Sequence, residues 1–256
     1  MSEEMSHEVA SSGEFYGAPM PANRNPVREL GDDRKPQHRV NNANTRRSGL
    51  PGVGNIGWGE HLCAFYSGKQ ELLKLVVPFI QAGLLDNEFC MWITGEPVTE
   101  RDAMEALEAV LPEAPEYLMR KQLEIVPYHQ WYLSSGAFNQ EVVLENCVSK
   151  ARYAEANGFA GIRITGNPFW LQSKEQWAQF GCFERNVEAS IKSECILALC
   201  TYPTERCSND HMVRILSNHG STLLNGNNEW QRLELRCCVP LTTNQPYNRI
   251  SRMEDQ

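Results

Sequence analysis

Residues 59–66 read GEHLCAFY, and a second apolar run, LALCTYP, occupies residues 197–203. Both runs are short, nearly continuous and rich in residues that suit a buried strand, a pattern typical of an α/β sheet. Soft or titratable side chains lie within each run or directly after it. Because α/β sheets bind ligands at the carboxyl ends of their strands, the two runs predict a small-molecule pocket.

Strand-like and helix-like segments alternate along the chain around these two runs. The expected strands are residues 62–66, 89–94, 123–128, 160–166 and 195–202, with an edge strand at 230–235. The expected helices contain residues 73–84, 104–111, 139–157, 173–191 and 210–218, and Thr99 is the expected cap of the second. This alternation is typical of βαβ units. It predicts a three-layer α/β fold with a mostly parallel central sheet flanked by helices.

The two ends of the chain lack this pattern. Residues 1–50 hold four prolines, several asparagines and few large apolar side chains. Such a composition does not offset the entropy cost of ordering the chain. We therefore expect a disordered polar tail at residues 1–50, a folded domain at residues 51–239 and a loose tail at residues 240–256.

Composition limits the classes of protein to which the chain can belong. Its 256 residues are 41% hydrophobic, which is enough for one domain with a full core. A formal net charge of −8 argues against direct nucleic-acid binding. No apolar run approaches the ~20 residues that span a bilayer, and the polar start is no signal peptide. We expect a cytoplasmic protein with reduced thiols, because the nine cysteines are odd in number and scattered.

Aromatic and polar side chains gather at the expected strand ends. They suit a cleft for a small, partly apolar ligand. The same residue types also occur commonly at the edge of a core, with only the hydroxyl or indole nitrogen in water. The candidate ligand-binding residues of this kind are Tyr66, Glu96, Tyr128, Trp131, Tyr132, Thr165, Trp170 and Tyr202.

Histidine and cysteine side chains form a second group of candidates. His61 and Cys63 are two residues apart on one strand, so their side chains share a face of the sheet. If the first and fifth strands are neighbours, Cys200 and Cys207 approach them, and four such groups can hold zinc, copper or haem iron. Buried cysteines are also common without a metal. His61, Cys63 and Cys200 are therefore candidates for contact with an organic ligand, and no cofactor is favoured.

Arg163 lies within the fourth expected strand. An isolated charge there costs too much free energy unless it is paired. Glu96 or Glu60 is the expected partner in a buried ion pair. The alternative is that Arg163 binds a ligand carboxylate.

Several strings together resemble a known family. They are residues 59–66, 81–84 with 87–92, 95–97, 126–128 with 131–132, 163–166 with 170–171, and 198–203 with 207–208. In their order and spacing these strings resemble the MEDS domain, the methanogen/methylotroph, DcmR sensory domain, over about residues 50–235. The resemblance implies a sensory module of prokaryotic signal transduction that is proposed to sense simple hydrocarbon derivatives. It also implies a RecA/KaiC-like α/β core.

That fold raises the question of nucleotide hydrolysis. A P-loop needs flexible glycines around the phosphates and a Ser or Thr hydroxyl for magnesium. Here the loop after the first strand keeps Gly68 and Lys69, but Cys63 stands at the first glycine position and Gln70 at the hydroxyl position. We therefore expect no ATPase activity and no other enzyme activity.

The expected function is a stand-alone sensory module. We expect it to bind a small organic ligand and to signal to a separate protein, a histidine kinase or a transcription regulator, or through self-association. Two alternatives remain open. One is a degenerate RecA/KaiC-like interaction scaffold without a ligand, and the other is a thiol protein or a binder of zinc, copper or haem.

Overall fold

The computed structural model describes residues 44–226 and 229–234. The expected tails therefore lie outside the described residues, except for residues 44–50. These form part of the fold, because strand β1 (Thr45–Arg47) pairs with β2 (Asn55–Gly57) and Leu50 is buried in the core. The domain boundary expected at residue 50 is thus too late in the sequence.

The central sheet has seven strands in the order β5-β4-β6-β7-β3-β8-β9. All neighbouring strands are parallel except β8 and β9, which are antiparallel. The strands are β3 (His61–Tyr66), β4 (Phe89–Thr94), β5 (Leu123–Pro127), β6 (Ile162–Gly166), β7 (Ile196–Pro203), β8 (Ser221–Gly226) and β9 (Glu229–Glu234). The mostly parallel sheet and the expected strands are confirmed, whereas β8 was not predicted.

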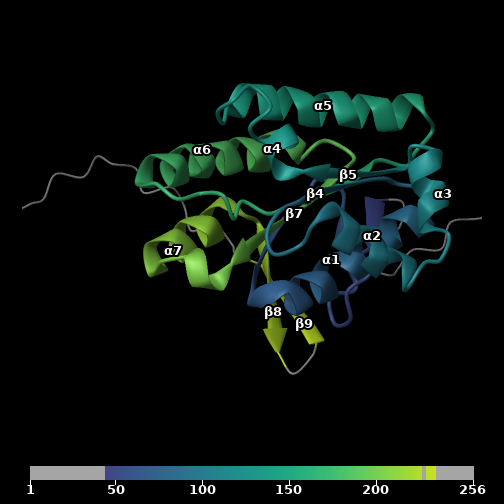
Figure 1. Cartoon of the computed structure of the whole chain (residues 1–256), viewed down its shortest axis with the longest axis horizontal. Helices are drawn as coiled ribbons and strands as arrows, with labels where there is room; N and C mark the ends of the chain where they lie inside the picture. Colours follow the sequence, from purple (N-terminus) through teal and green to yellow (C-terminus); the bar gives the residue numbers. More distant parts are fainter. Residues whose placement is uncertain (1–43, 227–228, 235–256) are drawn as a thin grey trace, which may run out of the picture. The chain divides into compact units, whose positions relative to one another are not determined.

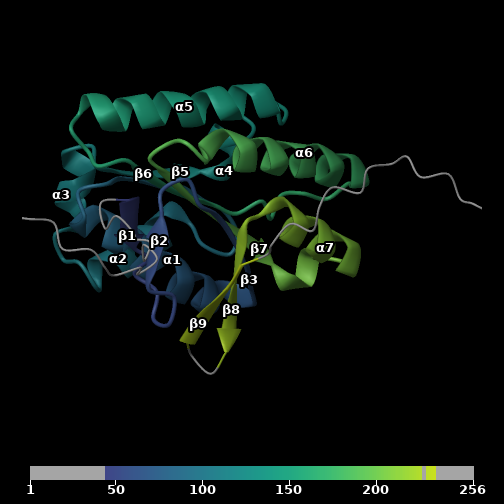
Figure 2. The same cartoon turned by 180° about the vertical axis from the view of Figure 1, so that it is seen from behind.

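Helices cover both faces of this sheet. Figure 1 shows α5 and α6 on one face and α1 and α2 on the other, and Figure 2 shows the same layers from behind. The helices are α1 (Gly68–Leu85), α2 (Glu100–Glu108), α3 (Ala114–Met119), α4 (Tyr128–Trp131), α5 (Gln140–Ala156), α6 (Lys174–Ile191) and α7 (Asn209–Asn218). The three-layer α/β fold is confirmed. Within the described residues, no helix has the length and apolar character to cross a membrane.

Strand β3 shows how the sequence separates the two cores. Its even positions, from Leu62 to Tyr66, pack with α1 and α2 in one core. Cys63 and Phe65 point to the other face and pack with α5 and α6. Strand β7 lies beside β3, with Cys63 opposite Cys200. This confirms that the first and fifth expected strands are neighbours in the sheet.

Side-chain caps fix where three of the helices, α2, α6 and α7, begin. Thr99 accepts a hydrogen bond from the backbone N–H of Asp102 at the start of α2, as expected. Equivalent capping boxes start α6 at Ser173 and α7 at Ser208. Helices α6 and α7 therefore have defined starting points.

The cap of α2 predicts a pH-dependent contribution to stability. Asp102 accepts a hydrogen bond from Lys69, whose Nζ lies 2.7 Å from Oδ1, and its contacts with the backbone and side chain of Thr99 add to this effect. Together they hold the pKa of Asp102 well below its usual range. A lowered folded-state pKa stabilises the fold above the unfolded pKa of about 3.9, and this contribution is lost as the pH falls through the folded value.

We therefore expect the Asp102→Asn variant to melt below the wild type at neutral pH, and the difference in Tm to shrink steadily below about pH 4. Thermal unfolding followed by circular dichroism across this pH range measures the difference. A Tm difference that stays constant down to the lowest pH at which the protein folds would contradict the assignment.

Candidate functional site

Four side chains, three of them buried and that of Cys200 partly buried, meet between the sheet and α6. They are His61 of β3, Glu184 of α6, Cys200 of β7 and His219 directly after α7, and we call them the His–Glu–Cys–His cluster. One donor atom from each lies within 4.8 Å of all the others. His61, Glu184 and His219 are at most 3% exposed. The cluster thus collects nitrogen, oxygen and sulfur ligand atoms where water is excluded.

Glu184 holds the cluster together. Its Oε2 lies 3.0 Å from His61 Nε2 and 3.2 Å from His219 Nε2, and 3.7 Å from Cys200 Sγ. Its Oε1 accepts a hydrogen bond of 2.8 Å from the hydroxyl of Tyr202. One carboxylate oxygen therefore faces both imidazoles and the thiol, while the other is fixed by a tyrosine.

The Nδ1 atoms of both histidines, which point away from Glu184, each face an oxygen atom. His219 Nδ1 lies 2.7 Å from the carbonyl oxygen of Ile215, one turn earlier in α7. His61 Nδ1 lies 3.5 Å from Glu188 Oε2. Glu184 and Glu188 are four residues apart, so α6 presents both carboxylates on one face. The contact of His219 orients its ring with Nε2 toward Glu184, while His61 Nδ1 and Glu188 Oε2 lie close together without forming a hydrogen bond.

Burial and charge shift the pKa values of these groups in different directions. Burial would raise the pKa of Glu184, but the neighbouring His219 and His61 lower it below its usual range. Burial would lower the pKa of His61, yet its contacts with Glu184 and Glu188 raise it. Burial and the charge of His61 lower the pKa of His219. Burial and Glu184 raise the pKa of the Cys200 thiol well above its ordinary value.

The structure brings only part of the predicted metal set together. His61 Nε2 and Cys200 Sγ are 3.3 Å apart. Cys63 is buried on the same face but belongs to the surrounding core, and Cys207 also lies outside the cluster. Glu184 and His219 take their places. Sequence reasoning missed Glu184, although a glutamate among Phe180, Phe183 and Val187 on one helix face was a usable signal.

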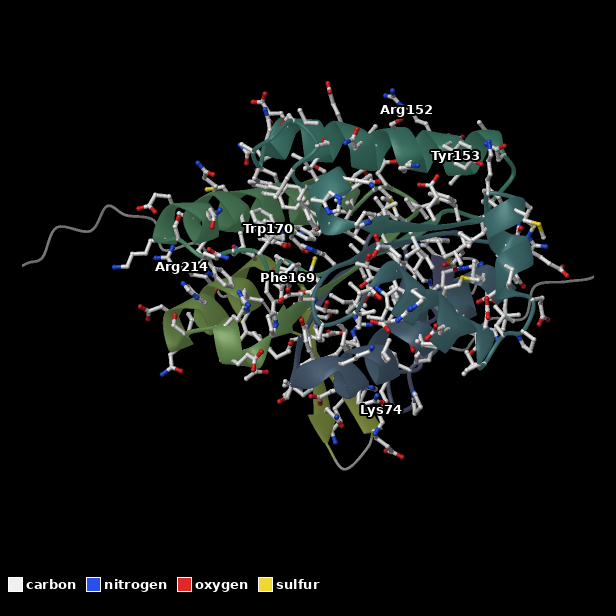
Figure 3. All side chains as sticks on the ribbon, in the orientation of Figure 1. Lys74, Arg152, Tyr153, Phe169, Trp170 and Arg214 are labelled. Carbon is white, nitrogen blue, oxygen red and sulfur yellow. The ribbon has the colours of Figure 1, made fainter. Side chains whose placement is uncertain are left out.

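The predicted aromatic residues pack against one another. Tyr132 lies 5.7 Å from Trp170 and 5.8 Å from Phe180, measured between ring centroids. Trp131, Tyr132 and Trp170 are all buried. Figure 3 shows Trp170 in the interior, whereas Arg214 projects from α7 at the edge of the molecule. These side chains fill the space of the expected cleft, and their contact with a ligand stays a prediction.

The remaining predicted residues lie in or near the strand ends and make polar or aromatic contacts there. Asn167 Nδ2 donates to the hydroxyl of Tyr66 at 2.8 Å and to the carbonyl oxygen of Glu96 at 2.9 Å. Tyr128 packs edge-on against Phe169, with ring centroids 4.8 Å apart. Thr165 is buried within β6. These contacts fix the loops that follow the strands.

The prediction that Arg163 pairs with Glu96 or Glu60 is wrong. Its guanidinium pairs with Glu88, with Nε 2.6 Å from Oε2 and Nη2 3.1 Å from Oε1, and both side chains are fully buried. Neither Glu96 nor Glu60 contacts it. The buried ion pair itself is as expected, but it lies on the α1 face of the sheet because β6 alternates its side chains between the two cores.

Arg163 has no N–H group left for a ligand. Beyond Glu88 it donates to three backbone carbonyl oxygens, those of Arg47, Ser48 and Phe79. These contacts use all five guanidinium N–H groups. The alternative that Arg163 binds a ligand carboxylate is therefore incompatible with this arrangement.

A pocket of about 340 Å³ opens between α6 and α7 next to the cluster. Glu184 and Tyr202 line it together with residues of both helices. Its other lining residues are Lys174, Trp177, Ala178, Phe180, Gly181, Ser208, Asp210, His211, Arg214, Ile215 and Asn218. Of the ligand-binding residues predicted from the sequence, only Tyr202 lines this pocket. The pocket and the buried cluster share the carboxylate of Glu184.

Comparison with known proteins places these features in a family context. The family model described as the methanogen/methylotroph, DcmR sensory domain matches residues 60–220. The transcriptional repressor DcmR of Methylorubrum extorquens is 26% identical over 191 residues, which cover 73% of this chain and 67% of that protein.

Two solved structures resemble the described fold. A KaiC-like protein of Pyrococcus horikoshii has a TM-score of 0.49 and 16% identity, covering 73% of this chain and 85% of that one. The flagellar accessory protein FlaH of Methanocaldococcus jannaschii has a TM-score of 0.43 and 11% identity, covering 70% and 78%.

Proposed function

This chain belongs to the MEDS family of sensory domains, and from that premise we propose that it binds a small organic ligand in the pocket between α6 and α7. Family membership and the likeness to a transcriptional repressor support a sensory or regulatory role. The observation that carries the proposal is the pocket lined by Glu184 and Tyr202. There, open space lies directly against these two buried polar side chains.

The lining of the pocket suits a small, partly apolar molecule. Trp177, Phe180 and Ile215 supply apolar walls. Polar lining residues such as Ser208, His211 and Asn218 supply contacts that orient a ligand. A volume of about 340 Å³ lies at the small end of the range for ligand pockets. A hydrocarbon derivative with one polar group fits this combination better than a nucleotide does.

Two contacts that join α6 to α7 provide a route for the signal. Asn218 Nδ2 donates to the carbonyl oxygen of Gly181 at 3.0 Å, and Trp177 stacks on His211 with ring centroids 4.0 Å apart. Both contacts border the pocket. A ligand shifts the spacing of the two helices only if it binds one spacing more tightly than another. We propose that a separate protein, a transcription regulator or a histidine kinase, reads that change.

We also propose that the chain does not hydrolyse ATP. Lys69, the residue that matches the P-loop lysine, forms an ion pair with Asp102. The next residue, Gln70, has no hydroxyl for magnesium.

Gly181 offers a direct test of the pocket. A Cβ atom at this position would meet Asn218 Nδ2 at 3.7 Å, which is an ordinary contact. We expect Gly181→Leu to fold, to fill the pocket and to abolish ligand binding. Gly181→Ala is the matched control, because it adds a single methyl group and removes a helix glycine that costs roughly 0.5–1 kcal/mol. It should be slightly more stable than the wild type and still bind.

Short-chain alcohols, aldehydes and chlorinated alkanes are the probes, and ligand-observed NMR is the measurement. Native mass spectrometry of the protein from its own host supplies a retained ligand as a further probe. Equal binding by the Gly181→Leu variant and the wild type would place the ligand elsewhere. Absence of binding by a correctly folded wild type, together with stable self-association, would favour the interaction scaffold instead.

A further inference from the structure

The His–Glu–Cys–His cluster contains more hydrogen-bond acceptors than donors. His219 Nδ1 faces the carbonyl oxygen of Ile215, which can only accept, so the hydrogen of the neutral ring lies on Nδ1. Tautomers are assigned from such contacts. The lone pair of His219 Nε2 therefore points into the cluster, toward Glu184 Oε2.

One proton cannot satisfy all the groups of the cluster. A proton on His61 Nε2 can be donated to Glu184 Oε2, 3.0 Å away. His219 Nε2 then still lies 3.2 Å from the same carboxylate oxygen. Both atoms present a lone pair to each other, and no proton lies between them. This nitrogen is buried and makes no hydrogen bond to any described residue. A buried acceptor without a partner is costly, and a cation at the centre of the cluster removes that cost.

The spacing of the four atoms matches that of ligands around one ion. Donors at 2.0–2.3 Å from a tetrahedral zinc ion lie about 3.3–3.7 Å from one another. Four of the six separations, the three that involve Glu184 Oε2 and the one between His61 Nε2 and Cys200 Sγ, run from 3.0 to 3.7 Å, and all four atoms lie within 4.8 Å of one another. Binding of an ion would therefore draw the more widely spaced side chains inward to complete the geometry.

The surroundings of the cluster are those of a metal site. In such sites the histidine ligand usually donates its second N–H to a carboxylate or a backbone carbonyl. Here His219 Nδ1 makes this contact with the carbonyl of Ile215, whereas His61 Nδ1 lies 3.5 Å from Glu188 Oε2 and does not form the hydrogen bond. Tyr202 holds the second oxygen of Glu184 in the same way.

We propose that His61, Glu184, Cys200 and His219 bind one Zn²⁺ ion through Nε2, Oε2, Sγ and Nε2. Two imidazoles, a carboxylate and a thiolate form a donor set that zinc favours over magnesium or calcium. The Cys200 thiol releases its proton to solvent as it binds, and His61 Nε2 binds as a lone pair, its hydrogen being released or carried on Nδ1 instead, so the ion, the thiolate and the carboxylate sum to zero charge. All four positions are filled by the protein, which makes the site structural. The inference does not depend on a ligand in the pocket.

Cobalt substitution tests the site, because Co²⁺ reports its ligands in the visible and near-ultraviolet spectrum. We expect the full chain, stripped of metal, to bind about one equivalent of Co²⁺ with a thiolate-to-cobalt charge-transfer band, and Zn²⁺ to displace it. Cys200→Ser should lose the band, and His219→Ala should lose tight binding. Glu188→Gln, which changes only a positioning residue, should weaken metal affinity about 10–100-fold.

Two matched variants control for general effects of these substitutions. Cys207→Ser removes a nearby thiol outside the cluster, and His129→Ala removes an exposed imidazole. Both should keep the cobalt spectrum and the affinity of the wild type. A folded wild type that binds neither ion tightly, or a charge-transfer band that survives Cys200→Ser, would overturn the proposal. If the cluster variants fail to fold, the presence or absence of the thiolate-to-cobalt band in the wild type tests the proposal.

Discussion

Replacing Glu88 by alanine is expected to lower the free energy of unfolding by about 3–5 kcal/mol, because it leaves the guanidinium of Arg163 charged and buried without its partner. Both side chains have zero exposure. The substitution also removes the partner of Arg46, whose Nε donates a hydrogen bond to Glu88 Oε1 at 2.7 Å. Urea unfolding followed by circular dichroism measures the change.

A double variant separates the loss of the ion pair from simple loss of volume. Arg163→Met with Glu88→Leu replaces both charges with apolar groups of similar size, and such replacements are often neutral or stabilising. It should recover part of the stability that Glu88→Ala loses, because the carbonyl oxygens of Arg47, Ser48 and Phe79 lose the donor that Arg163 provides.

The ion pair of Glu124 with Lys150 is the control, because both of its side chains are nearly one-third exposed. Glu124→Gln should cost about 1 kcal/mol or less. If Glu88→Ala were no more damaging than Glu124→Gln, the burial of the Arg163 network would be in doubt.

Phe180→Ala is expected to cost about 3–5 kcal/mol, the usual range for deleting a buried aromatic ring. Phe180 is 2% exposed, and its ring lies within 6 Å of the rings of Tyr132, Phe138, Trp170 and Phe183. Their shared packing fixes α6 on the sheet. The variant should therefore unfold at a lower urea concentration than the wild type.

Val213→Ala is the matched control for this helix layer. Val213 lies on α7 and is 63% exposed, so its truncation should change stability by no more than about 0.5 kcal/mol. Similar losses for Phe180→Ala and Val213→Ala would mean that the aromatic group does not pack as described.

The sequence predicted the layers well because the signal for them is local. A buried strand such as Phe89–Thr94 shows its character in six consecutive residues, and the helix that follows shows its period within a few turns. Strand β8 was missed because Ser221–Gly226 has only three large or β-branched residues in a row before Asn225 and Gly226. Its pairing with β3 is a tertiary contact that no local pattern reports.

The site was harder to predict because its parts come from distant segments. His61 and Cys200 were identified since both lie on apolar strands. Glu184 was not, because the register of α6 against the sheet decides whether a glutamate faces water or the interior. His219 was not singled out, because its approach to His61, with ring centroids 4.0 Å apart, depends on where α7 ends. The partner of Arg163 was missed for a similar reason, since Glu88 lies just before β4 rather than at a strand end.

The contacts of Arg163 with the carbonyl oxygens of Arg47 and Ser48 have a practical consequence for shortened versions of the protein. A fragment cut to the family match would start at residue 60 and would lack both acceptors, along with the cation of Arg46 beside Glu88. Its buried guanidinium would keep a full charge with fewer partners. Expression of the domain should therefore start upstream of Thr45, and fragments that begin later are expected to aggregate or to be degraded.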